Sequence, residues 1–87
     1  MKIEFDSDKA TKNLKKHDVS FEEAASCLLD PHALVREDYD AKGESRWILL
    51  GMNHQARLLV VVYTLRDDAI RLISARKPTS KEVSYYA

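Results

Sequence analysis

The feature that most constrains the fold is an unbroken apolar run from Leu58 to Tyr63. A short run rich in β-branched residues is typical of a buried strand, and it falls far below the roughly 20 residues that a membrane-spanning helix needs. Successive side chains of a strand point to opposite faces of the sheet. Because this strand lacks polar alternation, it predicts a sheet that is covered on both faces near its centre.

Further strands are predicted on either side of this run. The central strand is expected over residues 57–65, and three others at 33–37, 46–52 and 70–76. The last three strands along the chain are separated by short polar turns, which favour antiparallel pairing. The sequence therefore predicts an α+β domain whose sheet has four antiparallel strands.

A first helix is predicted ahead of the sheet. Asp6 or Ser7 can cap its N-terminus, and we expect it to run to about Lys16. Ala10 and Leu14 lie one turn apart and share an apolar face. This face is expected to pack against the sheet.

A second helix is predicted to begin at a capping box formed by Ser20 and Glu23. In this motif each side chain bonds to the backbone N–H of the other residue. Phe21 and Ala24 belong to its buried stripe. Pro31 ends it, because the residue before a proline disfavours the helical conformation.

A short C-terminal helix is predicted after the last strand. Thr79 and Glu82 have the spacing of another capping box, and the helix includes Tyr85 and Tyr86. The two N-terminal helices can cover one face of the sheet, but this short helix cannot cover all of the other. The remainder of that face is expected to be a partner surface, a substrate groove, or both.

Length and composition narrow the possible functions. Eighty-seven residues fit one domain, 1–87, and the single cysteine, Cys27, excludes an internal disulfide. The sequence has no glycine-rich phosphate loop, no metal-ligand spacing among its histidines and no serine nucleophile motif. We therefore expect no metal site and no cofactor. No signal-peptide segment is visible near the start, so a cytoplasmic protein without membrane association is expected.

The net charge is zero, but its distribution is uneven. Residues 1–41 carry six Lys and Arg against ten Asp and Glu, whereas residues 42–87 carry eight against four. Arginine dominates the basic half, and its guanidinium binds phosphate through two parallel hydrogen bonds. This asymmetry suits a nucleic-acid ligand, but composition alone favours a set of ordinary solvated surface charges.

Lysines form a basic stripe on the first predicted helix. Lys9, Lys12 and Lys16 lie on one side of that helix, beside its apolar face. A stripe of this kind can contact a phosphate backbone, but it is also typical of a solvated helix face. His17, at the end of the helix, can act as an acid or base near neutral pH. It can equally pack in the core or bond to the last carbonyl groups of the helix.

The last predicted strand carries Arg71 and Arg76. Strict alternation places their side chains on opposite faces of the sheet, unless a bulge intervenes. Arg76 ends the strand just before the C-terminal helix. A residue one or two turns along that helix can return over the strand end, so Arg76, Glu82 and Tyr86 are expected to form a cluster.

The sequence as a whole resembles the BrnT family of type II toxins. The stretches that carry the resemblance occur in order along the chain and cover nearly all of it: Phe5-Asp6, Lys9-Ala10, Asn13-Leu14, Lys16-His17, Val19 to Ala24, Asp30-Pro31, Glu44 to Trp47, Gly51-Met52, Val60 to Thr64, Arg66, Arg71 to Lys77, Glu82 and Tyr86. Relatives commonly have glycine where this chain has Asp18. If that position is left-handed, aspartate tolerates it better than most residues do.

The resemblance implies a RelE-like fold and a metal-independent endoribonuclease that blocks translation. It also implies a cognate ribbon-helix-helix antitoxin, and a complex that represses its own promoter and contacts DNA only through that antitoxin. The residues that match the family fall into a catalytic group and an RNA-binding group. The catalytic candidates are Arg76, Arg66, Lys9, Arg46, Arg71, His17 and Glu82. The RNA-binding candidates are Lys12, Lys16, Arg57, Lys77 and Tyr86.

The alternative is a binding module without catalysis, such as a co-repressor. An apolar central strand and a small core suit partner binding equally well. Expression of the isolated chain separates the two functions, because only a nuclease toxin arrests growth and degrades RNA. A stand-alone DNA-binding regulator is less consistent with the sequence, which has no exposed recognition helix.

Overall fold

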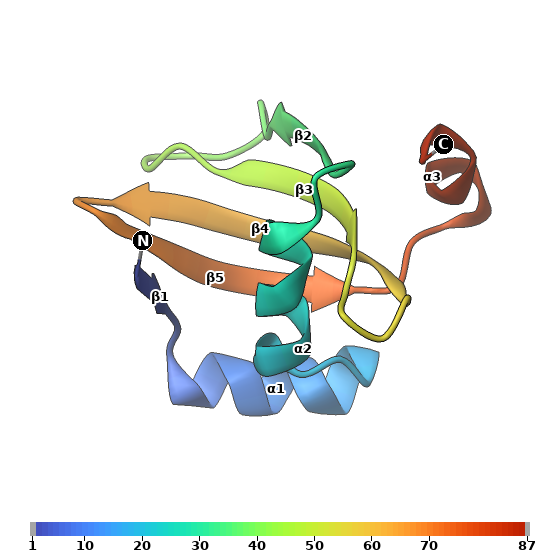
Figure 1. Cartoon of the computed structure of the whole chain (residues 1–87). Helices are drawn as coiled ribbons and strands as arrows, with labels where there is room; N and C mark the ends of the chain where they lie inside the picture. The colour runs from blue at the N-terminus through green and yellow to red at the C-terminus, as the bar shows by residue number, and fades with distance from the viewer. Residues whose placement is uncertain (1, 87) are drawn as a thin grey trace.

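The computed structural model describes residues 2–86. Its elements follow the order β1 (Lys2–Glu4), α1 (Ser7–His17), α2 (Phe21–Ser26), the 3₁₀ turn η1 (Cys27–Leu29), β2 (Leu34–Glu37), β3 (Trp47–Met52), β4 (Leu58–Arg66), β5 (Ala69–Arg76) and α3 (Ser80–Tyr85). The two N-terminal helices lie together against one face of the sheet, whereas α3 stands apart beyond the end of β5 (Figure 1). All three predicted helices and all four predicted strands are present.

The sheet has five strands, in the order β1-β5-β4-β3-β2. Strands β2 to β5 pair antiparallel as predicted, but the prediction of only four strands is wrong. The additional strand, β1, pairs parallel with β5 through Ile3 and Ile70 and their neighbours. A strand of three residues has too little sequence pattern to be predicted, and its partner lies at the other end of the chain.

The hydrophobic core lies between the two N-terminal helices and the sheet. Phe21 from α2, Leu59 and Val61 from β4 and Leu72 from β5 are almost completely buried there. Phe5 packs edge-on against Phe21, with ring centroids 5.3 Å apart. This packing is the expected result of placing an apolar helix stripe on a strand that is apolar throughout.

The buried face of α1 differs from the one predicted. Leu14 is half exposed, and the buried residue of the helix is Asn13. The Asn13 side-chain amide donates to the carbonyls of Ala75 and Val19, at 2.8 and 2.9 Å, and its oxygen accepts from the Ala75 N–H at 3.1 Å. Asn13 thus provides hydrogen-bond partners for the backbone of β5 at Ala75, beyond the point where β1 stops pairing with β5. These hydrogen bonds explain why a polar side chain is buried at this position.

The helix ends are only partly as predicted. Asp6 caps α1, and Asp18 ends it in a left-handed conformation with φ of 58°, which aspartate tolerates better than most residues do. The Ser20 hydroxyl accepts the Glu23 N–H at 3.0 Å. The reciprocal half of that capping box is absent among the described contacts, because the Glu23 carboxylate binds Asn53 and Arg57 instead.

A bulge in β5 changes which face its arginines occupy. Val62 pairs with Ser74 but Tyr63 pairs with Leu72, so Ile73 is an extra residue in the strand. Directly paired residues of antiparallel strands point to the same face. Their β4 partners, Thr64 for Arg71 and Val60 for Arg76, are four positions apart. Both arginines therefore lie on the face away from α1 and α2, and the expectation of opposite faces is overturned by the bulge.

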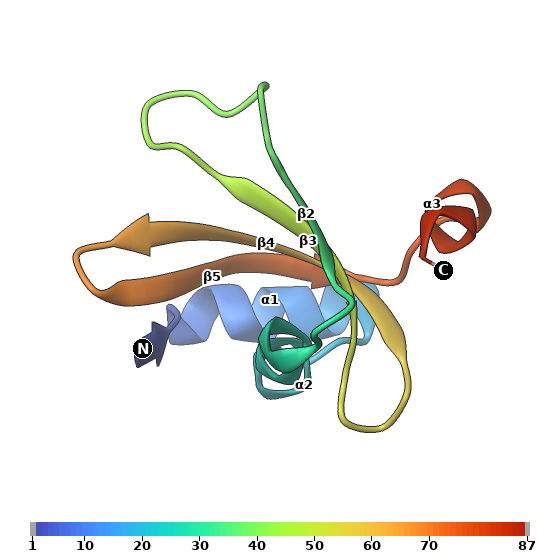
Figure 2. The same ribbon diagram turned by 45° about the horizontal axis from the view of Figure 1, so that its top comes forward.

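That second face, which we call the open face, is only partly covered. Helix α3 stands at its margin, and no helix covers the sheet between β2 and α3 (Figure 2). None of the residues of α3 is buried. No helix within residues 2–86 is long and apolar enough to cross a membrane.

Candidate functional site: a basic pocket on the open face

A pocket of about 370 Å³ near the β4–β5 turn is lined by residues of the open face and also by Lys9 of α1, and we call it the basic pocket. Five of the side chains that line it are cationic and two are acidic. The cationic residues are Lys9, Lys42, Arg46, Arg66 and Arg71; the others are Asp40, Glu44, Thr64 and Ile73. A concave surface with this charge excess is suited to an anionic ligand.

The cations of the basic pocket come from separate parts of the chain. Lys9 extends from the first turn of α1, where the Asp6 carboxylate accepts the N–H groups of Asp8 and Lys9 at 2.8 and 3.3 Å. These backbone hydrogen bonds lower the pKa of Asp6 and fix the start of the helix. Arg66 is the last residue of β4, and the bulge brings Arg71 of β5 to the same face. The pocket therefore depends on long-range packing.

Ion pairs hold three of these arginines in place. Arg66 binds Glu44 through two hydrogen bonds, at 2.9 and 3.0 Å, which lowers the pKa of Glu44 and raises that of Arg66. Arg46 lies 3.6 Å from Asp38, and Arg71 lies 3.6 Å from Glu4. The Arg66 and Glu44 side chains are both more than 40% exposed, so their pairing contributes little to the stability of the fold.

A second arginine site lies at the end of β5. Arg76 binds Glu82 of α3 through two hydrogen bonds, at 2.8 and 2.9 Å, which confirms the predicted contact between these residues. Glu82 also accepts the Thr79 N–H at 2.8 Å, completing the predicted capping box. The Arg76 hydrogen bonds lower the pKa of Glu82 to about 2. The Arg76 charge is therefore matched by a carboxylate that stays ionised at neutral pH.

Tyr86 does not join that pair. Its hydroxyl donates to the Asp30 carboxylate, which also accepts the Met52 and His32 N–H groups, at 2.8 and 2.9 Å. The hydrogen bond raises the pKa of Tyr86 and lowers that of Asp30. The expected three-residue cluster is wrong in this respect, because α3 turns Tyr86 toward the end of η1. Helix α3 is thus tethered at both ends.

The sequence model of one protein family matches residues 5–82, and that family is described as "Ribonuclease toxin, BrnT, of type II toxin-antitoxin system". The chain belongs to the BrnT family. The crystal structure of the Brucella abortus ribonuclease toxin BrnT is similar, with a TM-score of 0.70 and 24% sequence identity over 92% of this chain and 99% of that one. At this identity the likeness supports the fold alone. No curated protein matches the chain closely enough to count as a relative.

The structure brings together only part of the residue set that the BrnT resemblance implies. Lys9, Arg46, Arg66 and Arg71 line the basic pocket. His17 lies at the far end of α1, half-buried, and is not among the residues that line it. Exposed positions on α1 carry Lys12 and Lys16, which lie outside the pocket lining as well.

Two other RNA-binding candidates also lie elsewhere. Arg57 binds the Glu23 carboxylate at 2.8 Å and the Asp18 carbonyl at 3.5 Å, which ties the β3–β4 turn to the N-terminal helices. Lys77 is exposed just after β5.

Sequence reasoning did not assign to the site five of the nine residues that line the basic pocket: Asp40, Lys42, Glu44, Thr64 and Ile73. Lys42 belongs to the long loop before β3, whose path no local pattern predicts. Thr64 is buried, and its hydroxyl donates to the Ser45 carbonyl at 2.6 Å, which fixes the chain next to Arg46. One signal was available for Thr64: it is a polar residue at the end of an apolar strand, in step with Val60 and Val62.

Proposed function

We propose that the basic pocket binds the phosphate of an RNA strand and that this toxin cleaves RNA there, which inhibits translation. The observation that carries the proposal is the convergence of five cationic side chains in the lining of one pocket, which includes only two carboxylates, while Asp38 and Glu4 outside the lining lie 3.6 Å from Arg46 and Arg71. Arginine and lysine in a preorganised cluster stabilise the negative charge that develops on a phosphate during cleavage.

The proposed reaction needs no metal. The 2′-oxygen of the RNA attacks the neighbouring phosphorus, the bond to the 5′-oxygen breaks, and a cyclic phosphate remains. The proton of the 2′-hydroxyl passes to a base, and the leaving 5′-oxygen receives one from an acid. Arg66 and Arg71 are suited to stabilise the phosphate, and Lys9 is suited to serve as the acid. Glu44 becomes available as the base when a phosphate replaces it at Arg66.

Two of the other catalytic candidates, Glu82 and His17, receive non-catalytic roles in this proposal. Glu82 is a weak base because its pKa is about 2, and both of its oxygens bind Arg76. We therefore assign it to positioning Arg76 and α3. His17 lies outside the pocket, so its contribution is to the end of α1.

We further propose, from the resemblance, a RelE-like ribonuclease that is neutralised by a ribbon-helix-helix antitoxin. In this proposal the complex represses its own promoter, and the antitoxin provides the DNA contacts. A binding module without nuclease activity is the second candidate function. It is favoured by a second hollow on the open face, which is lined mainly by apolar side chains. Growth arrest by the isolated chain distinguishes the two.

The test is cleavage of a labelled RNA by the purified protein, with and without EDTA. Wild type is expected to cut equally well in both conditions. Arg66→Gln is expected to cut about 10²–10³ times more slowly, whereas Lys15→Gln, an exposed cation of α1, is expected to match wild type. Loss of cutting in EDTA would contradict the metal-free reaction, and full activity of a folded Arg66→Gln protein would contradict the role of the pocket.

A further inference from the structure

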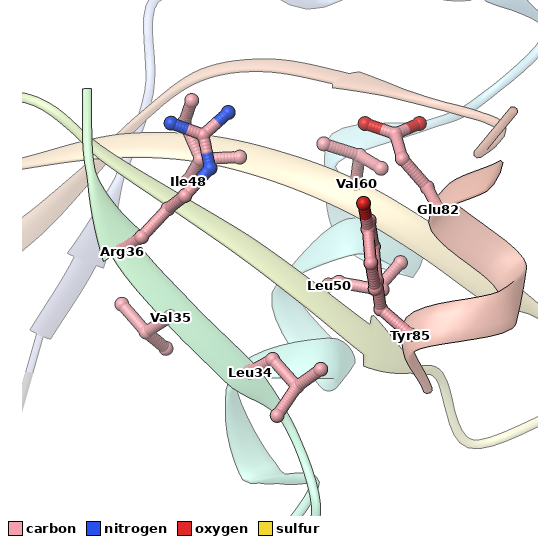
Figure 3. A pocket seen from close by; sticks show the side chains of 8 residues that line it. All are labelled: Leu34, Val35, Arg36, Ile48, Leu50, Val60, Glu82 and Tyr85. Atoms are coloured by element: carbon pink, nitrogen blue, oxygen red, sulfur yellow. The ribbon is translucent and has the colours of Figure 1, made fainter. Parts of the chain in front are cut away.

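The second hollow on the open face is a groove of about 510 Å³ between β2 and α3, and we call it the apolar groove. Ile48, Leu50 and Val60 form its floor, and Tyr85 forms part of the wall on the α3 side (Figure 3). The β2 wall is formed by Leu34, Val35 and Arg36.

Large hydrophobic side chains in the walls of the apolar groove are exposed to solvent. Leu34 is 46% exposed and Tyr85 57%; Val35 lines the groove as well, but it pairs with Leu49 and its side chain belongs to the other face of the sheet. Apolar residues gathered in one concave patch of a small protein mark an interaction site, whereas isolated ones do not. The strand β2 is also an edge strand of only four residues, so nothing on the sheet extends this wall further.

Helix α3 is attached to the body mainly through polar contacts. Its two anchors are the Arg76–Glu82 pair and the Tyr86–Asp30 hydrogen bond, and no residue of the helix is buried. A wall held in this way can adjust to an occupant without disturbing the hydrophobic core, which lies on the other face of the sheet.

The apolar groove and the basic pocket lie next to each other on β3 and the residues just before it. Ile48 lines the groove and Arg46, two residues earlier in the chain, lines the pocket. Alternate residues of a strand lie about 7 Å apart on one face. Arg36 adds a cation at the rim of the groove and forms no ion pair with any described carboxylate. A ligand that spans both hollows would therefore contact aliphatic side chains in the groove and cationic side chains in the pocket.

This combination favours a protein segment over RNA. Single-stranded RNA is held by aromatic stacking and by hydrogen bonds to base edges, and aliphatic side chains make up most of the groove. A polypeptide with apolar side chains followed by carboxylates complements both hollows. The partner that we take for this segment is the antitoxin, because the family is described as the toxin of a type II toxin-antitoxin system.

We propose that the antitoxin covers the open face with one continuous segment, whose apolar side chains fill the groove and whose carboxylates enter the basic pocket in place of RNA phosphates. This inference rests on the proposed function of the pocket. It gives a physical reason for neutralisation: the same segment that gains affinity from the groove excludes the substrate from the cations.

The first experiment measures the affinity of full-length toxin for its cognate antitoxin and, separately, the RNA cleavage by free toxin. Leu34→Glu places a charge on the groove wall and is expected to raise the antitoxin Kd by about tenfold or more. Its RNA cleavage should stay within about twofold of wild type. Leu14→Glu is the matched control, because Leu14 is 50% exposed on α1, on the opposite side of the sheet. It should change neither quantity.

The second experiment tests the carboxylate part of the segment. Lys42→Glu is expected to weaken antitoxin binding and to make that binding less dependent on salt, because one cation of the basic pocket is reversed. A 2′-O-methyl RNA oligonucleotide, which cannot be cleaved, is expected to compete with the antitoxin for wild-type toxin.

Several outcomes would overturn the proposal. Unchanged antitoxin affinity in Leu34→Glu means that the groove is not the docking site. Slower RNA cleavage by that variant, with antitoxin binding intact, identifies RNA as the occupant of the groove. Dimerisation of wild type that the variant loses identifies a second copy of the chain. A stable ternary complex with the oligonucleotide rules out competition. Failure of the nuclease proposal appears separately, as a wild-type toxin that cuts no RNA.

Discussion

The basic pocket and the Arg76–Glu82 site lie on the same face of one sheet, and both are built around arginine, but they are prepared for different tasks. In the pocket, cations outnumber the carboxylates and the closest ion pair is exposed to solvent. At the end of β5, Arg76 is matched by a single carboxylate that α3 provides. The proposed function assigns phosphate binding to the first site because it gathers several cations, whereas at the second site a single arginine is paired with a single carboxylate.

The largest expected effect separates the two arginines directly. Arg71→Gln removes a cation of the basic pocket whose only ion pair, with Glu4, is a long one of 3.6 Å, and it should slow RNA cleavage by about 10²–10³-fold. Arg76→Gln should slow it by about tenfold or less, through displacement of α3. Cleavage rates of the two purified variants provide the comparison, with circular dichroism as the control for folding. Equal losses in both would mean that the two sites act as one.

The next effect tests the strand that supports both sites. Asn13→Ala leaves the Ala75 N–H and carbonyl without their partner and should lower the free energy of unfolding by about 2–4 kcal/mol. Thr11→Ala, on the exposed side of the same helix, should change it by less than about 0.5 kcal/mol. Urea denaturation measures both. An Asn13→Ala protein as stable as wild type would show that β5 does not need this contact.

A smaller effect is confined to the Arg76–Glu82 site and depends on pH. Glu82 has a pKa of about 2 in the folded protein against an ordinary value of 4.5, so its pairing stabilises the fold above pH 4.5. That contribution, about 1 kcal/mol after allowance for solvent exposure, is lost as the pH falls toward 2. The Glu82→Gln protein should therefore be less stable than wild type at neutral pH, and the difference in stability should become smaller in acid. A constant difference between pH 7 and pH 2.5 would contradict the role of this pair.

The smallest effect concerns the lysines of α1. Lys12→Gln and Lys16→Gln should each slow RNA cleavage by less than about threefold, because both residues are exposed and lie outside the pocket lining. Cleavage at low and moderate salt measures any electrostatic contribution. A tenfold loss of cleavage rate in either variant would mean that the RNA also contacts α1, and that binding is not confined to the pocket.

The fold was largely predictable because its patterns are local. The apolar run from Leu58 to Tyr63 predicted the central strand, and the capping residue Thr79 predicted the start of α3. What escaped prediction depends on contacts between distant parts of the chain. Strand β1 exists only through pairing with β5, and the burial of Asn13 depends on an edge of that same strand.

The candidate site was less predictable than the fold for a related reason. The resemblance to BrnT toxins identified Lys9, Arg66 and Arg71, but spacing alone could not place them in one pocket. One extra residue, Ile73, reverses the face on which the end of β5 presents its arginine. Alternation predicts a regular strand, and the sequence contains no glycine or proline there to indicate a bulge.

The most direct test of the central claim is a map of where RNA contacts the protein. A 2′-O-methyl oligonucleotide is added to isotope-labelled toxin, and backbone amide shifts are followed by NMR. The account predicts that the largest changes cluster around Arg46, Thr64, Arg66 and Arg71. Changes centred on the exposed face of α1, or on Leu34 and its neighbours in the apolar groove, would contradict it.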